Sequence, residues 1–457
     1  MRGRVVVVVG ALGLLLARPA VAGTVNDPAT WTNRRLAAQL VVASVSMGGL
    51  GAAESWVRAG VGGVVLLGSP PAATQLHARL MRLRSLSVPQ PLVASDEEGG
   101  LVQRLTSVIY RLPSAESMGR HWTTAQVRAR ATDYGARMRA LGVDVNLSPV
   151  ADLSIAGHYI ERLDRGFSAD PAKAAAYVVA WQDGMAASHV AAVVKHWPGH
   201  GQASDTHAGA ATTPHLSVLQ QRDLVPFRAS IVAGVPAVMV GHLKVPGLTS
   251  GGVPASLSQQ AYRYLRARAA PSTVLMTDSL SMRAVTTALG LTPAEAAVRA
   301  LRAGADVALV DGDPMGVVAR VQRALDTGEY SRPAAVVSVK RLLMLKRLTT
   351  PPRLPTSLTP ADAAVTSLRP ALSGIVNDSI GGTLTARFFI RKTGSPTYDI
   401  VNGAAVSVPA GARASYTVAA GKLAYLTEYE WQLRACNAAA YCSPLTPARS
   451  FTTSPAP

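Results

Sequence analysis

The chain contains 457 residues, of which 48% are hydrophobic and 16% are charged, and its formal net charge at pH 7 is +18. This length is enough for one large domain and one small domain. The positive charge attracts anionic surfaces at low salt, but no basic run is interleaved with aromatic residues, so the composition excludes a typical nucleic-acid-binding protein.

The N-terminus has the pattern of a secretory signal peptide over residues 1–22. Two arginines precede the apolar run Val5–Ala17, and the small residues Ala20–Ala22 form a cleavage site. The run is too short for a comfortable membrane span, although an uncleaved N-terminal anchor is the alternative. The segment contains three arginines and no acid, so residues 23–457 keep a net charge of about +15. We expect a secreted or cell-wall-associated protein whose anionic partners are teichoic acid or peptidoglycan; a basic chain with no specific partner is the alternative.

Short apolar segments alternate with amphipathic helical patterns up to residue 348. This rhythm is typical of parallel β/α units. The segment Leu40–Ser44 either supplies an eighth strand or ends the first helix, and the predicted fold is a (β/α)₈ barrel over residues 23–348. The clearer strands are expected at Gly62–Leu67, Leu92–Ser95, Val143–Leu147, Ala191–Val194, Ala237–Val240, Val274–Thr277 and Asp306–Val310.

Helix signals support this alternation. The segment Thr292–Glu295 reads Thr-Pro-Ala-Glu, which is a capping box with proline at the first helical position. Gly304 ends that helix before the last strand. Two further helices are expected at Leu216–Ala233 and Ser338–Leu348.

A second domain is expected after the barrel. The proline-rich stretch Thr349–Thr356 predicts a stiff, extended linker, which we place at residues 349–358. Beyond it, segments such as Leu384–Ile390 and Tyr429–Arg434 alternate in hydrophobicity and are separated by turn residues. This pattern predicts a small antiparallel β-sandwich over residues 359–457.

The predicted sandwich contains both cysteines of the chain. Cys436 and Cys442 are close in sequence, as in an exported domain with one small disulfide loop, and two buried free thiols are the alternative. Tyr429 and the residues before it resemble the tyrosine corner of fibronectin type III domains, in which the phenol bonds to the backbone. We therefore expect Tyr429 to be structural, Trp431 to lie in the core, and the domain to act as a spacer rather than to bind carbohydrate.

The most polar loop of the barrel follows one of the predicted strands. The segment Lys195–Gly201 reads Lys-His-Trp-Pro-Gly-His-Gly. His196 and His200 have the spacing of helical zinc ligands, but the proline and glycines oppose a helix and no glutamate stands between them, so we expect no metal. Further along, Asp205 can hold the His207 imidazole in one tautomer and raise its basicity, as the acid partner does in a hydrolase triad.

Several polar residues are expected at the carboxyl ends of the predicted strands. In a (β/α)₈ barrel these ends converge on one mouth, so residues far apart in sequence can share a pocket. The residues in this position are Asp96, Asp152, Lys195, His196, His242 and Asp278.

These motifs resemble those of the β-N-acetylglucosaminidase branch of glycoside hydrolase family 3, over Leu36–Leu348. Lys195–Gly201 with Asp205–His207 resembles its Lys-His-Phe-Pro-Gly-His-Gly and Asp-Ser-His signature, and Asp96–Arg104 its Asp-Gln-Glu-Gly-Gly-Arg-Val-Gln-Arg segment. Further matches, in the family's order, are Asn146–Asp152, Asp164–Phe167, Pro254–Ser258 and Thr277–Met282.

The departures from the family pattern are few. Trp197 stands for phenylalanine, Leu101 for arginine and Gly166 for serine, and a C-terminal extension follows the barrel. None of these removes a catalytic residue, although Leu101 can alter the edge of the sugar site.

The resemblance implies a retaining glycosidase. Asp278 would attack the anomeric carbon, and His207 paired with Asp205 would be the acid/base, since imidazole titrates near neutrality. Without the resemblance, Asp278 could equally cap the following helix. Charged residues at a barrel mouth can also form salt bridges that lock its loops. The residues implied in sugar binding are Asp96, Arg165, Lys195 and His196, with Arg104, Asp152 and His242 as lesser candidates, of which Arg104 and Asp152 suit a salt bridge at least as well.

The resulting expectation is an exported, retaining exo-β-N-acetylglucosaminidase that removes terminal GlcNAc from peptidoglycan fragments and needs no cofactor or metal. Three alternatives stay open. The neutral dyad would tolerate phosphate as acceptor in a phosphorylase. A β-glucosidase of this family usually carries a glutamate acid/base in an α/β sandwich after the barrel, where this chain has a β-sandwich. A non-catalytic wall-binding protein would not need the set Asp278, Asp205 and His207.

Overall fold

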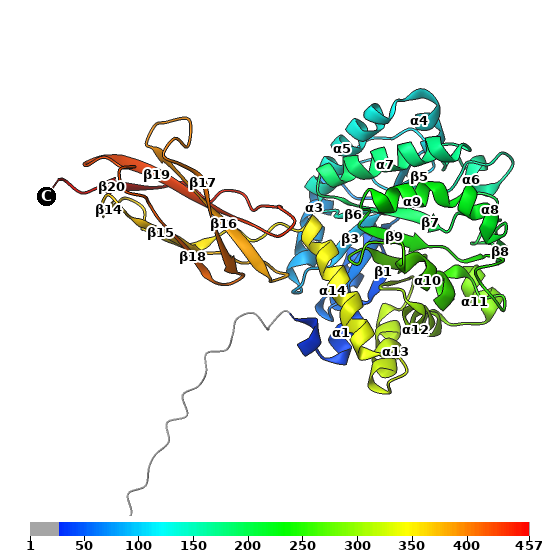
Figure 1. Ribbon diagram of the computed structural model, residues 1–457. Helices are drawn as coiled ribbons and strands as arrows, with labels where there is room; N and C mark the ends of the chain where they lie inside the picture. The colour runs from blue at the N-terminus through cyan, green and yellow to red at the C-terminus, as the bar shows by residue number, and fades with distance from the viewer. Residues whose placement is uncertain (1–26, 457) are drawn as a thin grey trace, which may run out of the picture.

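The computed structural model describes residues 27–456, which form a barrel domain and a smaller β-sandwich joined at one side of the barrel (Figure 1). The barrel holds the blue to yellow part of the chain and the sandwich the orange and red part. The predicted signal peptide, residues 1–22, lies outside the described residues. Within residues 27–456, no helix is both long and apolar enough to cross a membrane.

Parallel strands form the barrel wall in the order β11–β9–β7–β6–β3–β2–β1–β12. A bridge between Met276 and Val307 brings the two ends of this order together, so the barrel is nearly closed and the predicted fold is confirmed. Leu40–Ser44 is mostly strand, because helix α1 (Asn33–Gln39) ends before it. The wall consists of β1 (Val41–Ser46), β2 (Gly63–Leu67), β3 (Leu92–Ser95), β6 (Val145–Asn146), β7 (Ala191–Trp197), β9 (Ala237–Val240), β11 (Val274–Thr277) and β12 (Ala308–Val310).

Helices surround the barrel, and α14 (Arg332–Thr349) closes its floor. Leu342 and Leu345 of α14 pack in one cluster with wall residues such as Val42 and Val193. The apolar interior is thereby sealed at the amino-terminal ends of the strands. The other helices of this domain are α2 (Ala53–Arg58), α3 (Ala73–Ser85), α4 (Ala115–His121), α5 (Thr124–Leu141), α6 (Tyr159–Arg162), α7 (Pro171–Ala187), α8 (Leu216–Gln221), α9 (Leu224–Val232), α10 (Gln259–Arg266), α11 (Arg283–Leu289), α12 (Pro293–Ala303) and α13 (Pro314–Asp326).

The predicted capping box is present at the start of α12. The Glu295 backbone N–H donates to Thr292 Oγ1 at 3.3 Å, and the Thr292 N–H donates to the Glu295 carboxylate at 2.9 Å. Gly304, with φ of 127°, ends the helix as predicted. Both helix signals were therefore read correctly from local sequence.

The single helix expected at Leu216–Ala233 is wrong, because two helices occupy this segment. The α8 helix ends at Gln221, the backbone of Arg222 leaves the helical region, and α9 begins at Leu224. Asp223 is buried at the break and pairs with Arg222. The apolar pattern continues through the break, but Pro226, four residues after Arg222, disfavours a continuous helix there.

Two short sheets fold the loops over the mouth of the barrel. After β3, the strands β4 (Glu97–Gly99) and β5 (Val102–Gln103) form an antiparallel pair. After β7, β8 (Ala211–Thr212) pairs in parallel with β10 (Leu243–Lys244). These pairs help to fix the segments that carry Asp96, Arg104, Asp205, His207 and His242.

The second domain is a sandwich of a three-stranded and a five-stranded sheet. Its pairs are antiparallel, as predicted, except that β14 lies parallel to β20. Trp431 is fully buried, as expected, and the Tyr429 hydroxyl accepts a hydrogen bond from the Ala424 N–H at 2.9 Å. The strands are β13 (Thr356–Thr359), β15 (Ala371–Ile375) and β18 (Arg413–Thr417) in one sheet, and β14 (Ala364–Thr366), β20 (Arg449–Thr453), β19 (Glu428–Cys436), β16 (Thr383–Lys392) and β17 (Val401–Pro409) in the other.

The sandwich contacts the floor of the barrel through the loop between Cys436 and Cys442, which form a disulfide. Tyr441 in this loop stacks on His189 with 3.7 Å between ring centroids, and its hydroxyl accepts a hydrogen bond from Arg139 Nε at 3.0 Å. Since Arg139 and His189 come shortly before β6 and β7, this contact lies opposite the mouth. The predicted linker gave no indication of this direct interface.

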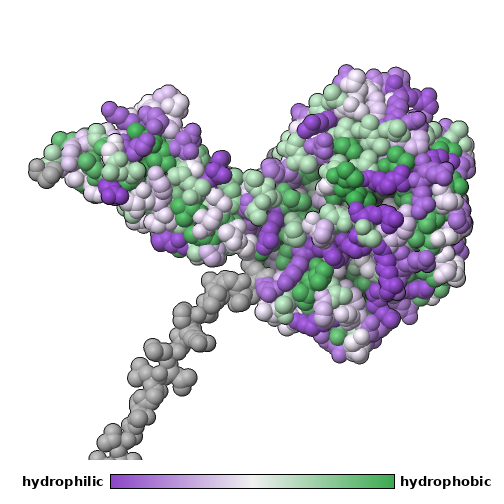
Figure 2. Space-filling model, viewed as in Figure 1, coloured by the Kyte–Doolittle hydropathy of each residue, from purple (hydrophilic) through white to green (hydrophobic). Residues whose placement is uncertain are grey.

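Asn437 strengthens the same junction at the end of α14. Its side-chain amide donates to the carbonyls of Arg347, at 2.8 Å, and Thr350, at 3.2 Å. The sandwich therefore caps the helix that closes the barrel floor. On the face seen in Figure 2, hydrophilic residues form broad bands over the barrel. On the sandwich, hydrophilic and hydrophobic residues are more evenly mixed.

Candidate active site

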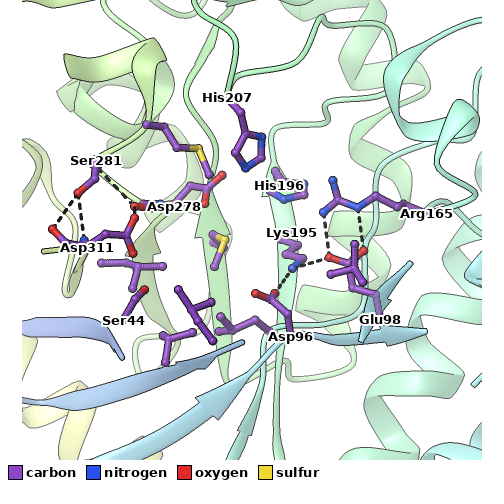
Figure 3. A pocket seen from close by; sticks show the side chains of 18 of the residues that line it. Ser44, Asp96, Glu98, Arg165, Lys195, His196, His207, Asp278, Ser281 and Asp311 are labelled. Atoms are coloured by element: carbon purple, nitrogen blue, oxygen red, sulfur yellow. Dashed lines mark hydrogen bonds and ion pairs between the residues drawn. The ribbon is translucent and has the colours of Figure 1, made fainter. Parts of the chain in front are cut away.

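A cavity of about 470 Å³ opens at the carboxyl ends of the barrel strands (Figure 3). Polar side chains from several strand ends and loops meet there, as expected for a (β/α)₈ barrel. Seven of the ten candidate residues line it: Asp96, Arg104, Arg165, Lys195, His196, His207 and Asp278.

One wall of the pocket is a buried ion-pair network. Lys195 Nζ donates to Asp96 at 2.6 Å and to Glu98 at 2.7 Å, and the Arg165 guanidinium makes two bonds of 2.8 Å to Glu98. Burial alone would raise the pKa of Glu98, but Arg165 and Lys195 hold it well below its usual range. Glu98, Lys195 and Arg165 are thus charged, and the donors and acceptors of the network are fixed before a sugar arrives.

Asp278 lies across the pocket from this network, directly after β11. Its Oδ1 accepts a hydrogen bond from the Ser279 N–H at 2.8 Å. Burial would raise the pKa of Asp278, but the neighbouring histidines, the hydrogen bond from the Ser279 N–H and the charge of Lys195 lower it below its usual value, so the carboxylate is ionised. The helix-cap alternative is not supported, because α11 begins at Arg283 and the residue at its N-cap, Met282, makes no capping bond.

His207 and Asp205 form a hydrogen-bonded pair at the mouth. His207 Nδ1 lies 2.8 Å from Asp205 Oδ1, and the His207 N–H donates to the same oxygen at 2.9 Å. The His207 side chain is 59% exposed and lines the pocket, whereas Asp205 stands behind it. With the hydrogen on Nδ1 shared with the carboxylate, Nε2 is the nitrogen left for a ligand.

Asp152 and His242, predicted as lesser sugar ligands, support the pocket from behind instead. Asp152 accepts a hydrogen bond from His196 Nδ1 at 2.6 Å and from the backbone N–H of His196 and of His200. His242 is buried between the Ser256 hydroxyl, at 2.7 Å, and the Ser279 carbonyl, at 2.8 Å. Because protein groups occupy these polar atoms, neither side chain reaches the cavity.

Arg104 lines the cavity and makes no salt bridge within residues 27–456, contrary to the salt-bridge alternative. Its Nε is buried without a hydrogen-bond partner. Its backbone N–H donates to Glu97 at 3.3 Å, and Glu97 also accepts from the Tyr134 hydroxyl at 2.7 Å. The β4–β5 turn is therefore anchored to the barrel through Glu97, and Arg104 is left free to meet a ligand.

Several pocket residues were missed as sequence candidates, among them Glu98, Asp311 and Tyr159. Glu98 lies inside the Asp96–Arg104 motif, but the direction in which its side chain points depends on the pairing of β4 with β5. Asp311 follows the last strand, where the strand-end rule could have found it, and it accepts a bond from the Ser279 hydroxyl at 2.5 Å. Tyr159 belongs to no motif, so no sequence signal pointed to it. Within residues 27–456, no three His, Cys, Asp or Glu side chains are grouped so that they could hold a metal ion.

An ionised carboxylate and a histidine–aspartate pair at the mouth of a (β/α)₈ barrel define a glycosidase-type site. The model of the glycosyl hydrolase family 3 N-terminal domain matches residues 37–345. The chain therefore belongs to glycoside hydrolase family 3 and is a glycosidase. The match covers the barrel and stops before the sandwich.

Individual relatives agree with this assignment. β-Hexosaminidase LpqI of Mycobacterium tuberculosis is 40% identical over 297 residues, which cover 63% of this chain and 76% of that protein. The structure of a family 3 glycosyl hydrolase from Mycobacterium smegmatis gives a TM-score of 0.64 at 37% identity, covering 70% of this chain and 98% of that one. The structure of a family 3 β-N-acetylglucosaminidase from a Paenibacillus species gives a TM-score of 0.65 at 28% identity. The match covers 70% of this chain and 63% of that one.

Proposed function

We propose that the protein is an exported, retaining exo-β-N-acetylglucosaminidase. The observation that carries the proposal is that buried, ionised Asp278 shares one pocket with His207, which is backed by Asp205 at the mouth. The relatives named β-hexosaminidase and β-N-acetylglucosaminidase support the choice of sugar.

The mechanism uses these residues in two steps. First, Asp278 attacks the anomeric carbon, while protonated His207 gives its Nε2 proton to the departing oxygen, so that a glycosyl ester forms and the alcohol leaves. Second, neutral His207 takes a proton from water, and the resulting hydroxide attacks the same carbon and releases Asp278. Each step inverts the configuration at the anomeric carbon, so the two steps together retain it.

The ion-pair wall would hold the sugar in place for this attack. Lys195 is fixed by Asp96 and Glu98, and Arg165 is fixed by Glu98, so binding hydroxyl and acetamido groups requires little rearrangement. His196 is oriented by Asp152 in the same way and presents its other nitrogen to the cavity. These side chains are proposed to bind the substrate rather than to break its bond.

Peptidoglycan fragments are the proposed substrate, and the wall is the proposed location. Support comes from the signal-peptide pattern of residues 1–22 and from the net positive charge. We place the catalytic domain at residues 23–348, a linker at 349–358, and a fibronectin type III-like spacer at 359–457. The bond between Tyr429 and the backbone supports that last assignment.

Turnover of model glycosides tests the function. The protein should hydrolyse 4-nitrophenyl β-GlcNAc much faster than the β-glucoside and should release β-GlcNAc as first product. A phosphorylase is the second candidate, because the dyad member that lines the pocket is the His207 imidazole rather than the negatively charged carboxylate of a glutamate. Formation of hexosamine 1-phosphate in phosphate buffer would favour that activity, and a faster β-glucoside reaction would contradict the proposed sugar.

A further inference from the structure

Ser279 directly follows the proposed nucleophile, and all three of its polar groups are hydrogen-bonded. Its backbone N–H donates to Asp278 Oδ1 at 2.8 Å, and its carbonyl accepts from His242 Nε2 at 2.8 Å. Its hydroxyl donates to the carboxylate of Asp311 at 2.5 Å. A hydroxyl–carboxylate bond of this kind is stronger than a bond between neutral groups. Ser279 is therefore a buried and fixed residue beside Asp278.

Asp311 supplies this anchor from the last strand of the barrel. It follows β12 directly and lines the pocket on the side of Asp278, across from the ion-pair wall (Figure 3). Its backbone N–H donates to Ser281 Oγ at 3.0 Å, and the Ser281 hydroxyl donates to its carbonyl at 3.2 Å. The Leu280 N–H donates to the Leu309 carbonyl at 2.9 Å. Three consecutive residues after Asp278 are thus bonded to the end of β12.

These bonds lie at the seam where the barrel is nearly closed. β11 and β12 are the two ends of the strand order. β11 pairs in register with β9 over all four of its residues, whereas β12 meets it at an isolated bridge between Met276 and Val307. A side chain at the end of a strand keeps rotational freedom unless its neighbours fix it. The bond from Asp311 therefore adds a side-chain link at the less regular side of the strand that carries the nucleophile.

The two carboxylate oxygens of Asp278 have different surroundings. Oδ1 accepts the bond from the Ser279 N–H, whereas Oδ2 makes no hydrogen bond within residues 27–456. Attack on a carbon atom requires one oxygen at a defined distance and angle, and a displacement of about 1 Å can cost a hundredfold in rate. The N–H that holds Oδ1 therefore determines where Oδ2 lies, and the bonds of Ser279 keep that N–H in place.

We propose that Asp311 is a positioning residue for the nucleophile: through the Ser279 hydroxyl, it fixes the N–H that holds Oδ1 of Asp278, so that Oδ2 meets the anomeric carbon. The proposal rests on the proposed function. The groups proposed to hold the sugar lie on the opposite wall of the pocket. Loss of Asp311 should therefore slow the attack without weakening the binding of the substrate.

The test measures the release of 4-nitrophenol from 4-nitrophenyl β-GlcNAc in a single turnover with enzyme in excess. This leaving group needs little protonation, so the rate constant reports the attack by Asp278. In Ser279→Ala and in Asp311→Ala, the rate constant should fall about tenfold, and the enzyme concentration for half-saturation should stay within about twofold. Asp311→Asn keeps an acceptor oxygen for the hydroxyl, so its rate constant should stay within about threefold of the wild type.

Two comparisons separate this role from a general loss of stability. If Asp311 acts through Ser279, the double alanine variant should lose no more than either single variant, because both changes remove the same bond. Ser338→Ala is the matched control: it removes a hydroxyl–carboxylate bond of 2.8 Å, to Asp306, at the other end of β12. Its rate constant should equal that of the wild type. Ser279→Ala deletes a single oxygen atom, so it carries the test alone if Asp311→Ala does not fold.

The outcomes distinguish this role from the proposed function. If the wild-type protein does not hydrolyse the GlcNAc glycoside, the proposed function is wrong and the positioning role falls with it. If it does, but the alanine variants keep the wild-type rate constant or only bind the substrate more weakly, the function stands and the positioning role is wrong. Losses that multiply in the double variant, or an Asp311→Asn variant as slow as Asp311→Ala, would also contradict the role. An equal loss of rate in both alanine variants that does not multiply supports it.

Discussion

Asp278 differs from the neighbouring pocket carboxylates in its partners. Asp96 and Glu98 are neutralised by Lys195 and Arg165, whereas Asp278 makes no ion pair within residues 27–456 and accepts a bond from its own neighbour, Ser279. It is nevertheless ionised, for the electrostatic reasons given above. A carboxylate that is charged but not held by a cation is suited to attack a carbon atom.

Replacement of this carboxylate tests its role as nucleophile. Asp278→Asn keeps the shape but cannot form the glycosyl ester, so kcat should fall by at least about a thousandfold while the thermal unfolding midpoint is retained. Asp311→Asn removes a charge from the same pocket and should cost far less. A variant at Asp278 with activity within about tenfold of the wild type would contradict the assignment.

The acid/base role of His207 predicts a dependence on the leaving group. His207→Ala should slow substrates with poor leaving groups by about a hundredfold or more and activated aryl glycosides much less, because only the former need strong protonation of the departing oxygen. His121→Ala, an exposed histidine on α4, is the control. Equal losses on both kinds of substrate would count against the role.

The sequence located many residues of this site but did not show the directions in which their side chains point. Strand ends gave Asp96, Lys195 and Asp278, because in a barrel their side chains must converge. The same rule wrongly made Asp152 a candidate sugar ligand, because a carboxylate at a strand end can also turn away from the cavity and orient a histidine. Tyr159 lines the cavity but could not be found, because it belongs to no motif and follows no predicted strand.

At the scale of elements, the strands were easier to predict than the helices. Buried parallel strands are continuous apolar runs, and every expected strand of the barrel overlaps an observed one. The break between α8 and α9 was missed, although Pro226 stands four residues after Arg222 and disfavours a continuous helix, because proline lacks an N–H and its ring clashes with the carbonyl four residues earlier. The parallel pairing of β14 with β20 likewise depends on tertiary contacts that alternation does not encode.

Helix α14 contains a buried amine with a measurable consequence for stability. Lys346 is 1% exposed and donates to Gln39 at 2.9 Å, and burial lowers its pKa from 10.5 to about 7. Between these two values the unfolded chain binds more protons than the native one. This residue therefore makes the free energy of unfolding rise as pH increases from about 7 towards 10.

Substitution of Lys346 should remove that rise. Urea unfolding at pH 7 and pH 9 should show a smaller increase for Lys346→Met than for the wild type, by up to about 1.4 kcal/mol per pH unit. Lys340→Met, at an exposed position of the same helix, should keep the wild-type slope. Identical slopes for all three proteins would mean that Lys346 is protonated in the native state.

At the scale of the whole molecule, the sandwich is docked rather than merely tethered. Tyr441 and Asn437 reach the ends of three barrel helices, although the proline-rich stretch suggested that few contacts would cross. Composition can reveal that a segment is extended, but whether two finished domains then meet depends on the shapes of both surfaces. The proposed catalytic residues nevertheless all belong to the barrel.

Removal of the second domain should therefore affect stability more than chemistry. A chain ending near Leu348 should keep turnover of 4-nitrophenyl β-GlcNAc but unfold several degrees lower, because the floor helix loses its cap. Tyr441→Ala in the full chain should lower the unfolding midpoint without changing kcat, and Tyr425→Ala, exposed away from the junction, should change neither. A shortened protein that is folded by circular dichroism yet inactive would show that the sandwich contributes to the active site.

The docking of the sandwich to the barrel floor also fixes the direction of the pocket relative to the sandwich: the mouth opens away from it. Asp27, where the described chain begins, pairs with Lys340 on the floor helix, so both routes out of the barrel start from the end opposite the mouth. An attachment made through the sandwich would leave the pocket pointing away from the attachment point. An enzyme oriented in this way would trim free ends that approach from the surrounding medium more readily than the surface to which it is held.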